Sequence, residues 1–466
     1  MLETLMVKIL NALSGPRRTT DGGTGLLLGR GTESGQAIHL GRDQRVQHAV
    51  VLGKSGVGKT HFLQHLVYQH FERNEGFCFF DFHGDAVNRL LELAAQFPEA
   101  ANRLVLFDPT DPDYSPGLNP LEIDPAHEHQ GFSRTAELTA ILKQRWGMDS
   151  FGARTEELMR HVFYTLAVNG YTLVDASALL TSRHFRSRLI AQLRNQEVLS
   201  YWLDRYEPLS EPMKAVFREP LLNKLSGFVT DPLSRQLLGQ QQSTLSFATA
   251  MAQGQWVLIN LSKGLLRDHA HTLGNLIFAK LQFDVMARAS LPERSRPIFT
   301  IFCDETQNLA ENDLGILITE GRKYSASIFT SSQFWEQLPR DLRNVLFAAG
   351  SHVIFRVSAH DARTLSSELS GSTRHKQSQL TDLERGQAIV RIGSAPAQLV
   401  NVPKLPSRHP VIPIRELRQL ARTRNARDRH EVELEIRNRR DAVGHADLGP
   451  TINERTTTQP EGQTGW

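Results

Sequence analysis

The chain has 466 residues, 40% hydrophobic and 22% charged, a composition that can bury a sizeable core and excludes an overall disordered or fibrous protein. Its formal net charge of +3 is too small to indicate nucleic-acid binding by itself, so any basic surface has to be local. No apolar run reaches membrane-spanning length, and Cys78 and Cys303 lie in apolar runs typical of reduced, buried thiols. The length indicates two or three domains, or one large domain with an insertion.

Residues 1–45 are predicted to form an N-terminal helix and a lead-in segment. The helix would place six apolar residues on one stripe: Leu2, Leu5, Met6, Ile9, Leu10 and Leu13. This stripe suits packing on the body of the protein or on a neighbour better than membrane contact, and the segment lacks a signal-peptide cleavage pattern. We therefore expect a soluble, cytoplasmic protein, and leave open a position at the periphery of a membrane complex.

A strand, a glycine-rich loop and a helix follow one another from residue 48. "HAVVL" reads as a buried strand, and helical spacing follows through Phe62, Leu66 and Tyr68. The loop between them, "GKSGVGKT", fills the pattern G-x-x-x-x-G-K-[ST] that binds phosphates in this setting. Its residues are Gly53, Lys54, Ser55, Gly56, Val57, Gly58, Lys59 and Thr60.

The chemistry of this loop predicts ATP and Mg²⁺ as cofactors. Glycines let backbone N–H groups converge on phosphate oxygens, and the helix N-terminus adds positive potential. Lys59 is expected to reach the β- and γ-phosphates, and Thr60 to ligate Mg²⁺. The alternative is a glycine turn with a structural role only.

Further strands and a change of period define the domains. Strand-like runs at 76–85 and 103–111 and a proline-rich boundary segment complete a first ATPase part, 46–125. The spacing then becomes helical, which predicts an inserted all-helical subdomain over 126–240. Sheet character returns at 255–262, and the second ATPase part, 241–404, continues with a long helix and strand-like runs at 296–303, 326–333, 352–358 and 386–392. Alternating strands and helices predict an α/β fold with a parallel-dominated sheet.

Asp304 and Glu305 follow the hydrophobic run 296–303 directly. A carboxylate at the C-terminal end of a strand is where a Walker B group meets Mg²⁺, which makes Asp304 a second candidate metal ligand. Glu305 would then polarise the attacking water as a general base. An acidic pair after a strand is common by itself, but it gains weight beside an intact phosphate-binding loop.

Two residues downstream bear on the type of ATPase. Arg322 is predicted at the end of a helix and Gln333 at the tip of the next strand. A polar amide at that tip can sense the γ-phosphate, and an arginine on a subunit surface can complete a neighbour's site. The alternative for Arg322 is a surface salt bridge.

Past residue 404 the composition shifts. Residues 415–440 hold nine arginines and five acidic residues, and 445–466 are polar and rich in glycine. We predict an arginine-rich helix, solvated or docking a partner, and a flexible C-terminal tail within 405–466.

Six stretches together resemble the HerA/FtsK superfamily of hexameric DNA-pumping ATPases, and within it the TraG/TraD-like coupling proteins of type IV secretion. They are "GKSGVGKT", "DFHGD", "LFDPTDPDYSPGLNPL", "CDETQN", "EGRKY" and "SSQ", and the resemblance covers roughly residues 45–400. It implies a RecA-like P-loop NTPase fold in which the helical insertion caps the entrance of a ring. It also implies Walker A residues at Lys59 and Thr60, a Walker B pair at Asp304 and Glu305, an arginine finger at Arg322 acting in trans and a sensor at Gln333.

By this resemblance the protein is a homohexameric, DNA-stimulated ATPase that pumps DNA through a central channel in conjugation or a related process. Its partners would be DNA, bound without regard to sequence, and a secretion channel, relaxase or nuclease. Cations on channel loops would hold the DNA backbone, and the candidates are Lys263, Arg267, Arg374 and Lys376, each of which could also be an ordinary surface charge.

Two features of the family are not found in this sequence. Membrane-anchored coupling proteins carry N-terminal transmembrane helices, and HerA proteins carry an N-terminal β-barrel for which 45 residues are too few. A HerA-like helicase that works with a nuclease in DNA processing or phage defence therefore stays open as an alternative. So does an ATP-dependent assembly platform that recruits partner proteins.

Overall fold

The computed structural model describes residues 25–123, 130–146, 152–309, 311–368 and 377–444. The predicted N-terminal helix, the predicted flexible tail at 445–466, and Arg374 and Lys376 lie outside these residues.

An eleven-stranded sheet forms the centre of the molecule, in the order β2-β1-β12-β11-β10-β3-β9-β8-β4-β7-β5. All pairings from β10 to β5 are parallel, and the four pairings on the other side of β10 are antiparallel. The predicted α/β fold with a parallel-dominated sheet is therefore confirmed. The parallel strands are β10 (Ser351–Ile354), β3 (Ala49–Leu52), β9 (Ala326–Ser332), β8 (Phe299–Cys303), β4 (Phe77–Asp81), β7 (Trp256–Asn260) and β5 (Leu104–Phe107).

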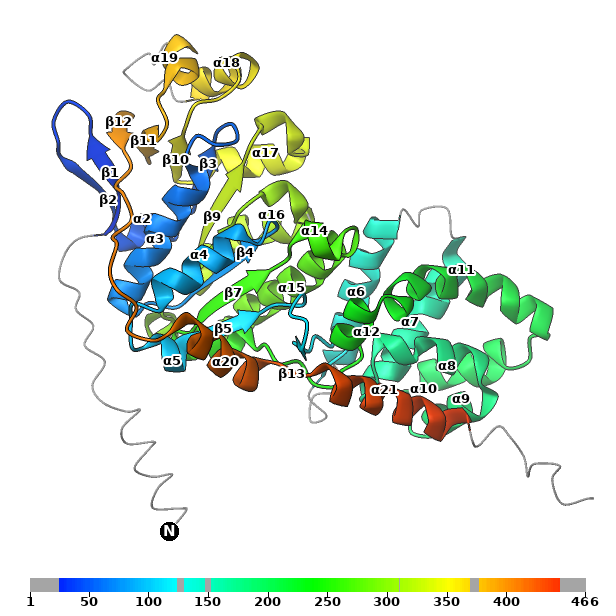
Figure 1. The fold of residues 1–466 in the computed structure, drawn as a ribbon. Helices are drawn as coiled ribbons and strands as arrows, with labels where there is room; N and C mark the ends of the chain where they lie inside the picture. The colour runs from blue at the N-terminus through cyan, green and yellow to red at the C-terminus, as the bar shows by residue number, and fades with distance from the viewer. Residues whose placement is uncertain (1–24, 124–129, 147–151, 310, 369–376, 445–466) are drawn as a thin grey trace, which may run out of the picture.

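Helices cover both faces of the parallel part, which is why its strands are continuous apolar runs (Figure 1). Successive side chains of β4 enter opposite cores: Phe77 and Phe79 pack with α3 (Lys59–Arg73) and α4 (Asp85–Ala94), whereas Cys78 and Phe80 pack with α15 (His269–Met286). The long helix predicted after 255–262 is α15, and its face through Leu273, Ile277, Leu281 and Val285 is buried in the second core.

Three antiparallel strands extend the sheet beyond β11 (Gln387–Ile392). They are β1 (Leu26–Gly31), β2 (Ala37–Leu40) and β12 (Gln398–Asn401). Their sequences do not predict strands, because they are short and carry glycine and polar residues in place of a continuous apolar run. Two of them lie in the segment that we took as a lead-in to the ATPase domain.

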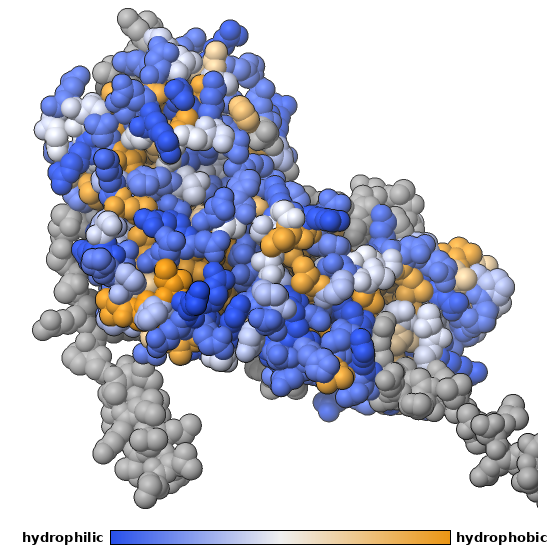
Figure 2. Space-filling model, viewed as in Figure 1, coloured by the Kyte–Doolittle hydropathy of each residue, from blue (hydrophilic) through white to orange (hydrophobic). Residues whose placement is uncertain are grey.

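A helical lobe stands beside the sheet (Figure 1). It has its own buried residues, among them Trp202, whose Nε1 donates to Thr165 Oγ1 at 2.9 Å. Figure 2 shows hydrophobic side chains on the surface of this lobe. Met213 and Val216 of α11 are 43% and 62% exposed. Its helices are α6 (Gln130–Trp146), α7 (Gly152–Val168), α8 (Ala176–Thr181), α9 (Arg183–Ile190), α10 (Gln196–Ser200), α11 (Glu211–Thr230) and α12 (Pro232–Leu238).

The arginine-rich segment forms two helices, α20 (Ile414–Asn425) and α21 (Arg429–Gly444), joined by the short strand β13 (Arg427–Asp428). We call residues 414–444 the C-terminal strap, because it runs from the sheet core to the helical lobe (Figure 1). Its apolar residues enter both cores: Leu417 and Ala421 in that of α3, and Val432 and Ile436 in that of the lobe. The strap therefore packs its apolar face on its own chain, while several of its charged side chains, among them that of Arg437, are exposed. Docking of a partner on this segment stays a prediction.

Polar contacts fix the middle of the strap. β13 pairs with β6 (Tyr114–Ser115) in the proline-rich segment that connects core and lobe. Arg429 donates from Nε to the carbonyl of Asp111 at 2.7 Å and from Nη2 to the carbonyl of Pro109 at 2.6 Å. Arg422 Nε donates to Asp111 Oδ2 at 2.7 Å.

Replacing Arg429 by Ala is expected to destabilise the fold by about 1–3 kcal/mol, because two carbonyl groups of the connecting segment lose a charged donor. The midpoint of urea unfolding measures this loss. The control is Arg437→Ala in α21, whose side chain is 66% exposed and pairs with Glu433 one turn away, and its effect should stay within about 0.5 kcal/mol. Equal midpoints for both variants would show that the hydrogen bonds of Arg429 to the connecting segment add nothing to stability.

Candidate nucleotide-binding site

The predicted phosphate-binding loop joins the end of β3 to the start of α3. Gly58, immediately before the helix, has φ +116°, a conformation that residues with a Cβ rarely adopt. At Gly53 a Cβ would lie 2.6 Å from Phe355 Cβ, so only glycine lets the loop pass so close to the end of β10. The sequence thus builds a sharply bent loop that leads into the N-terminus of a 15-residue helix, as anion binding requires.

The ammonium group of Lys59 lies inside this loop. Its Nζ donates to the carbonyls of Gly53 at 2.6 Å and Lys54 at 2.9 Å, and the residue is 6% exposed. Burial lowers the pKa of Lys59, and the carboxylates of Asp304 and Glu305 act in the opposite direction. A buried cation held at a glycine loop is placed to meet phosphate oxygens.

Thr60 and Asp304 are brought together across the sheet. Thr60 Oγ1 donates to Asp304 Oδ2 at 2.8 Å, and Asp304 follows directly after β8, which is two strands from β3. Burial raises the pKa of Asp304, while hydrogen bonds from Thr60 and Ser331 favour its charged form. A hydroxyl and a buried carboxylate in contact fit a hard cation such as Mg²⁺, which takes oxygen ligands and completes its shell with phosphates and water.

Glu305 has a strained backbone and a carboxylate held by two amides. Its φ of +58° is unusual for a residue with a long side chain, and it is 8% exposed. Gln333, which follows β9, donates from Nε2 to Glu305 Oε1 at 2.7 Å, and Gln307 donates to Oε2. The predicted base and the predicted sensor therefore touch. Gln307 was missed, although it lies within the stretch "CDETQN".

The residues just named share one edge of the sheet, whereas Arg322 lies at the opposite edge. Gln333 follows the last residue of β9, and Arg322 lies in the turn Gly321–Tyr324 before its first residue. The seven residues of β9 separate them by roughly 20 Å. Arg322 is exposed and forms no ion pair with any of the carboxylates that the structure describes, so it is remote from the loop of its own chain.

The two DNA-contact candidates inside the described residues have different surroundings. Arg267 directly follows the short helix α14 (Lys263–Leu266) and is exposed. Lys263 instead turns inward, and its Nζ donates to Asn308 Oδ1 at 2.6 Å; Asn308 in turn donates to the backbone carbonyl of Glu305, the predicted base. That Lys263 holds DNA is therefore not supported by its contacts, while Arg267 stays a prediction.

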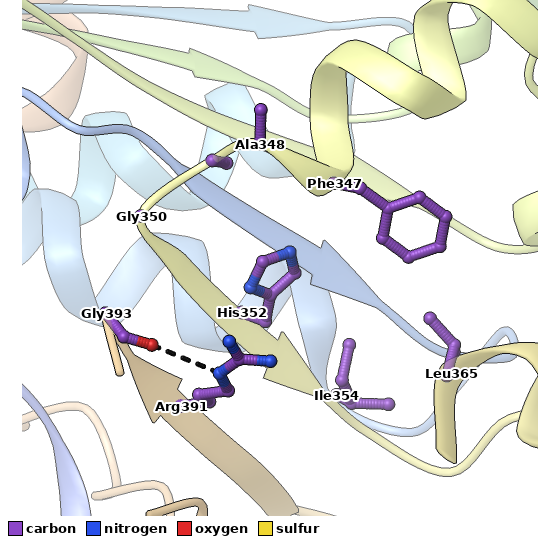
Figure 3. A pocket seen from close by; sticks show the side chains of 9 residues that line it. Phe347, Ala348, Gly350, His352, Ile354, Leu365, Arg391 and Gly393 are labelled. Carbon is purple, nitrogen blue, oxygen red and sulfur yellow. Dashed lines mark hydrogen bonds between the residues drawn. The ribbon is translucent and has the colours of Figure 1, made fainter. Parts of the chain in front are cut away.

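A cavity of about 280 Å³ lies on the antiparallel side of the sheet (Figure 3). His352 and Arg391 line it, with the aromatic ring of Phe347 across from them, and Arg391 Nε donates to the carbonyl of Gly393 at 3.1 Å. Burial lowers the pKa of His352 to about 4, so its ring is neutral at neutral pH. The cavity lies where β10 begins and β11 ends, at the edge opposite the phosphate-binding loop, and it is therefore separate from the nucleotide site.

A glycine loop after β3, a buried lysine, a hydroxyl–carboxylate pair and a glutamate–glutamine pair at one sheet edge define a P-loop ATPase of the RecA-like type. The chain belongs to the family of type IV secretion-system coupling proteins, since the model of that family's DNA-binding domain matches residues 35–388. The resemblance drawn from the six sequence stretches is thus confirmed.

Solved structures agree with this fold. The bacterial conjugative coupling protein TrwB, in a form named TrwBdeltaN70, is 17% identical, with a TM-score of 0.59 over 84% of this chain and 92% of that one. Plasmid coupling protein TrwB in complex with the non-hydrolysable ATP analogue ADPNP is 18% identical, with a TM-score of 0.57 over 80% and 89%. VirB4 of Thermoanaerobacter pseudethanolicus is 13% identical, with a TM-score of 0.54 over 83% and 98%. No curated protein matches the sequence.

Proposed function

We propose that this protein is an ATP-driven, homohexameric DNA translocase, a coupling ATPase that pumps DNA through a central channel in conjugative transfer or a related DNA-processing system. The observation that carries the proposal is the meeting of Lys59, Thr60, Asp304, Glu305 and Gln333 at one edge of the sheet. Membership of the coupling-protein family supports DNA as the substrate, and the solved TrwB complex with ADP and Mg²⁺ supports these cofactors.

The residues divide the chemistry among them. Lys59 would neutralise the β- and γ-phosphates, and Thr60 and Asp304 would hold Mg²⁺, whose charge favours phosphoryl transfer when it is bound. Glu305 would orient and deprotonate the attacking water. Gln333 ties the position of that carboxylate to the tip of β9, where it would sense the γ-phosphate.

The position of Arg322 supports a ring. An arginine that lies a strand's length, roughly 20 Å, from Gln333 of its own chain can complete a site only on a neighbouring subunit. If Arg322 acts on ATP, the sites therefore lie at subunit interfaces, and a closed ring of identical subunits gives every loop such a partner.

The cellular location of the protein and its protein partners are proposed from its family. No helix within the described ranges is long and apolar enough to cross a membrane. We propose a cytoplasmic position at the periphery of a secretion complex, with a channel component or relaxase as protein partner. The HerA-like helicase with a nuclease is less well supported, because the family match is to coupling proteins.

The test is ATPase activity measured with and without DNA, together with displacement of a triplex-forming strand as a readout of movement. We expect DNA to stimulate hydrolysis and ATP to drive displacement. The control Lys59→Ala should lose both activities with its grip on nucleotide. An equal rate of ATP hydrolysis with and without DNA, together with no displacement of the strand, would favour the assembly platform over the motor.

A further inference from the structure

The short helix α14 connects the solvent-exposed surface to the Walker B segment. Two residues separate it from β7, and its first residue, Lys263, donates its backbone N–H to the carbonyl of Phe82 at 3.1 Å. At its other end Arg267 is exposed, with φ +50° and ψ −128°, a conformation that residues with a side chain rarely adopt. One turn of helix thus joins an exposed cation to a side chain that bonds to Asn308, the residue that holds the backbone carbonyl of Glu305.

Lys263 reaches the general base through one further residue. Its Nζ donates to Asn308 Oδ1 at 2.6 Å, and Asn308 Nδ2 donates to the backbone carbonyl of Glu305 at 2.9 Å. Asn308 is 5% exposed, so its amide is fixed between these two partners. The methylene stem of Lys263 also brings Nζ to 5.8 Å from the ring centroid of Phe82.

This path acts on the part of Glu305 that is under strain. The carboxylate of Glu305, whose φ is left-handed, accepts from Gln333 and Gln307. The backbone carbonyl of Glu305 itself accepts from Asn308 Nδ2. A shift of Lys263 that frees or turns the Asn308 amide would remove one of the contacts that maintain this conformation. The Glu305 carboxylate could then leave its two amides and turn toward the attacking water.

We propose that Lys263 is a positioning residue that transmits DNA contact at α14 to Glu305 through Asn308. The inference rests on the proposed DNA-stimulated ATPase and adds to it the route of stimulation. It assigns the two cations of α14 different tasks: Arg267 contacts the DNA backbone, and Lys263 reports that contact to the base.

The experiment uses the full chain and measures the kcat and KM for ATP with saturating duplex DNA, and DNA affinity over a series of salt concentrations. Lys263→Met keeps the stem over Phe82 and removes the donor. We expect its DNA-stimulated kcat to fall about tenfold, the effect of one charged hydrogen bond, with KM for ATP and the salt slope of DNA binding unchanged. Lys263→Arg, which keeps the charge and the donors, should recover much of the rate.

Two further variants separate the path from simple damage. Asn308→Ala should reproduce the loss seen in Lys263→Met, and the double variant should lose no more than either single one, because both cut the same path. Arg267→Ala should lower the log–log salt slope of DNA binding by about 0.9, the value for one phosphate contact.

The outcomes distinguish failure of the proposed DNA-stimulated ATPase from failure of the positioning role of Lys263. If the unmodified protein hydrolyses ATP without response to DNA, the proposed function fails. If DNA stimulates the unmodified protein and Lys263→Met alike, the positioning role alone fails. A lower salt slope in Lys263→Met would overturn it as well, since Lys263 would then be a direct DNA contact.

Discussion

Replacing Glu305 by Gln is expected to leave ATP bound and to reduce its hydrolysis by about 10²- to 10⁴-fold, the usual contribution of a general base. The change keeps the size of the side chain and removes only the group that accepts the proton of water. The loop, Lys59 and the Thr60–Asp304 contact do not depend on this carboxylate, so nucleotide affinity should be retained. Phosphate release measures kcat, and titration with a fluorescent ATP analogue measures binding.

Glu336, in the turn after β9, provides a matched control. It lies three residues after Gln333, is 58% exposed and pairs with His360, so Glu336→Gln makes the same chemical change at a carboxylate whose described partner is not a residue of the site. It should hydrolyse ATP at the unmodified rate. Near-normal hydrolysis by the Glu305→Gln protein would mean that another group activates water, and the assignment of the base would be wrong.

The parallel core and the reacting groups could be predicted because each has a local signature. β3, β4, β7 and β8 are buried on both faces, and full burial requires an unbroken apolar run that is visible in the sequence. Parallel strands bring their C-terminal ends to one edge. That polar residues after such runs, like Asp304 and Gln333, lie in one site could therefore be predicted without knowing the register of the strands.

Features that depend on contacts between distant segments could not be predicted in the same way. The charges of the strap are typical of a solvated helix, yet Arg422 and Arg429 bond to a segment more than 300 positions earlier. Lys263 was read as a loop cation because nothing local shows that Asn308, 45 positions later, lies within reach of its Nζ. β12 pairs with β1 across almost the whole chain, and neither strand has a strong pattern of its own.

Replacing Arg322 by Ala is expected to leave nucleotide binding intact and to lower turnover by about 10³-fold, the effect of losing an arginine finger. The reason is its place at the sheet edge opposite the loop, from which it cannot reach its own ATP. Lys323→Ala is the control, because Lys323 is the adjacent exposed cation on the same turn and should be dispensable.

A mixture of two inactive proteins tests whether Arg322 acts in trans. Arg322→Ala subunits keep an intact loop, and Lys59→Ala subunits keep an intact arginine, so activity should return wherever the first kind receives the arginine of the second. In rings mixed at random from equal amounts, about a quarter of the interfaces pair an intact loop with an intact arginine. The recovered activity should therefore be highest near equal amounts of the two proteins. Rings shown by native mass spectrometry to contain both kinds, yet inactive at every ratio, would argue against a role in trans. A chain that stays monomeric with ATP, Mg²⁺ and DNA would rule out the ring itself, because Arg322 would then have no second loop to serve.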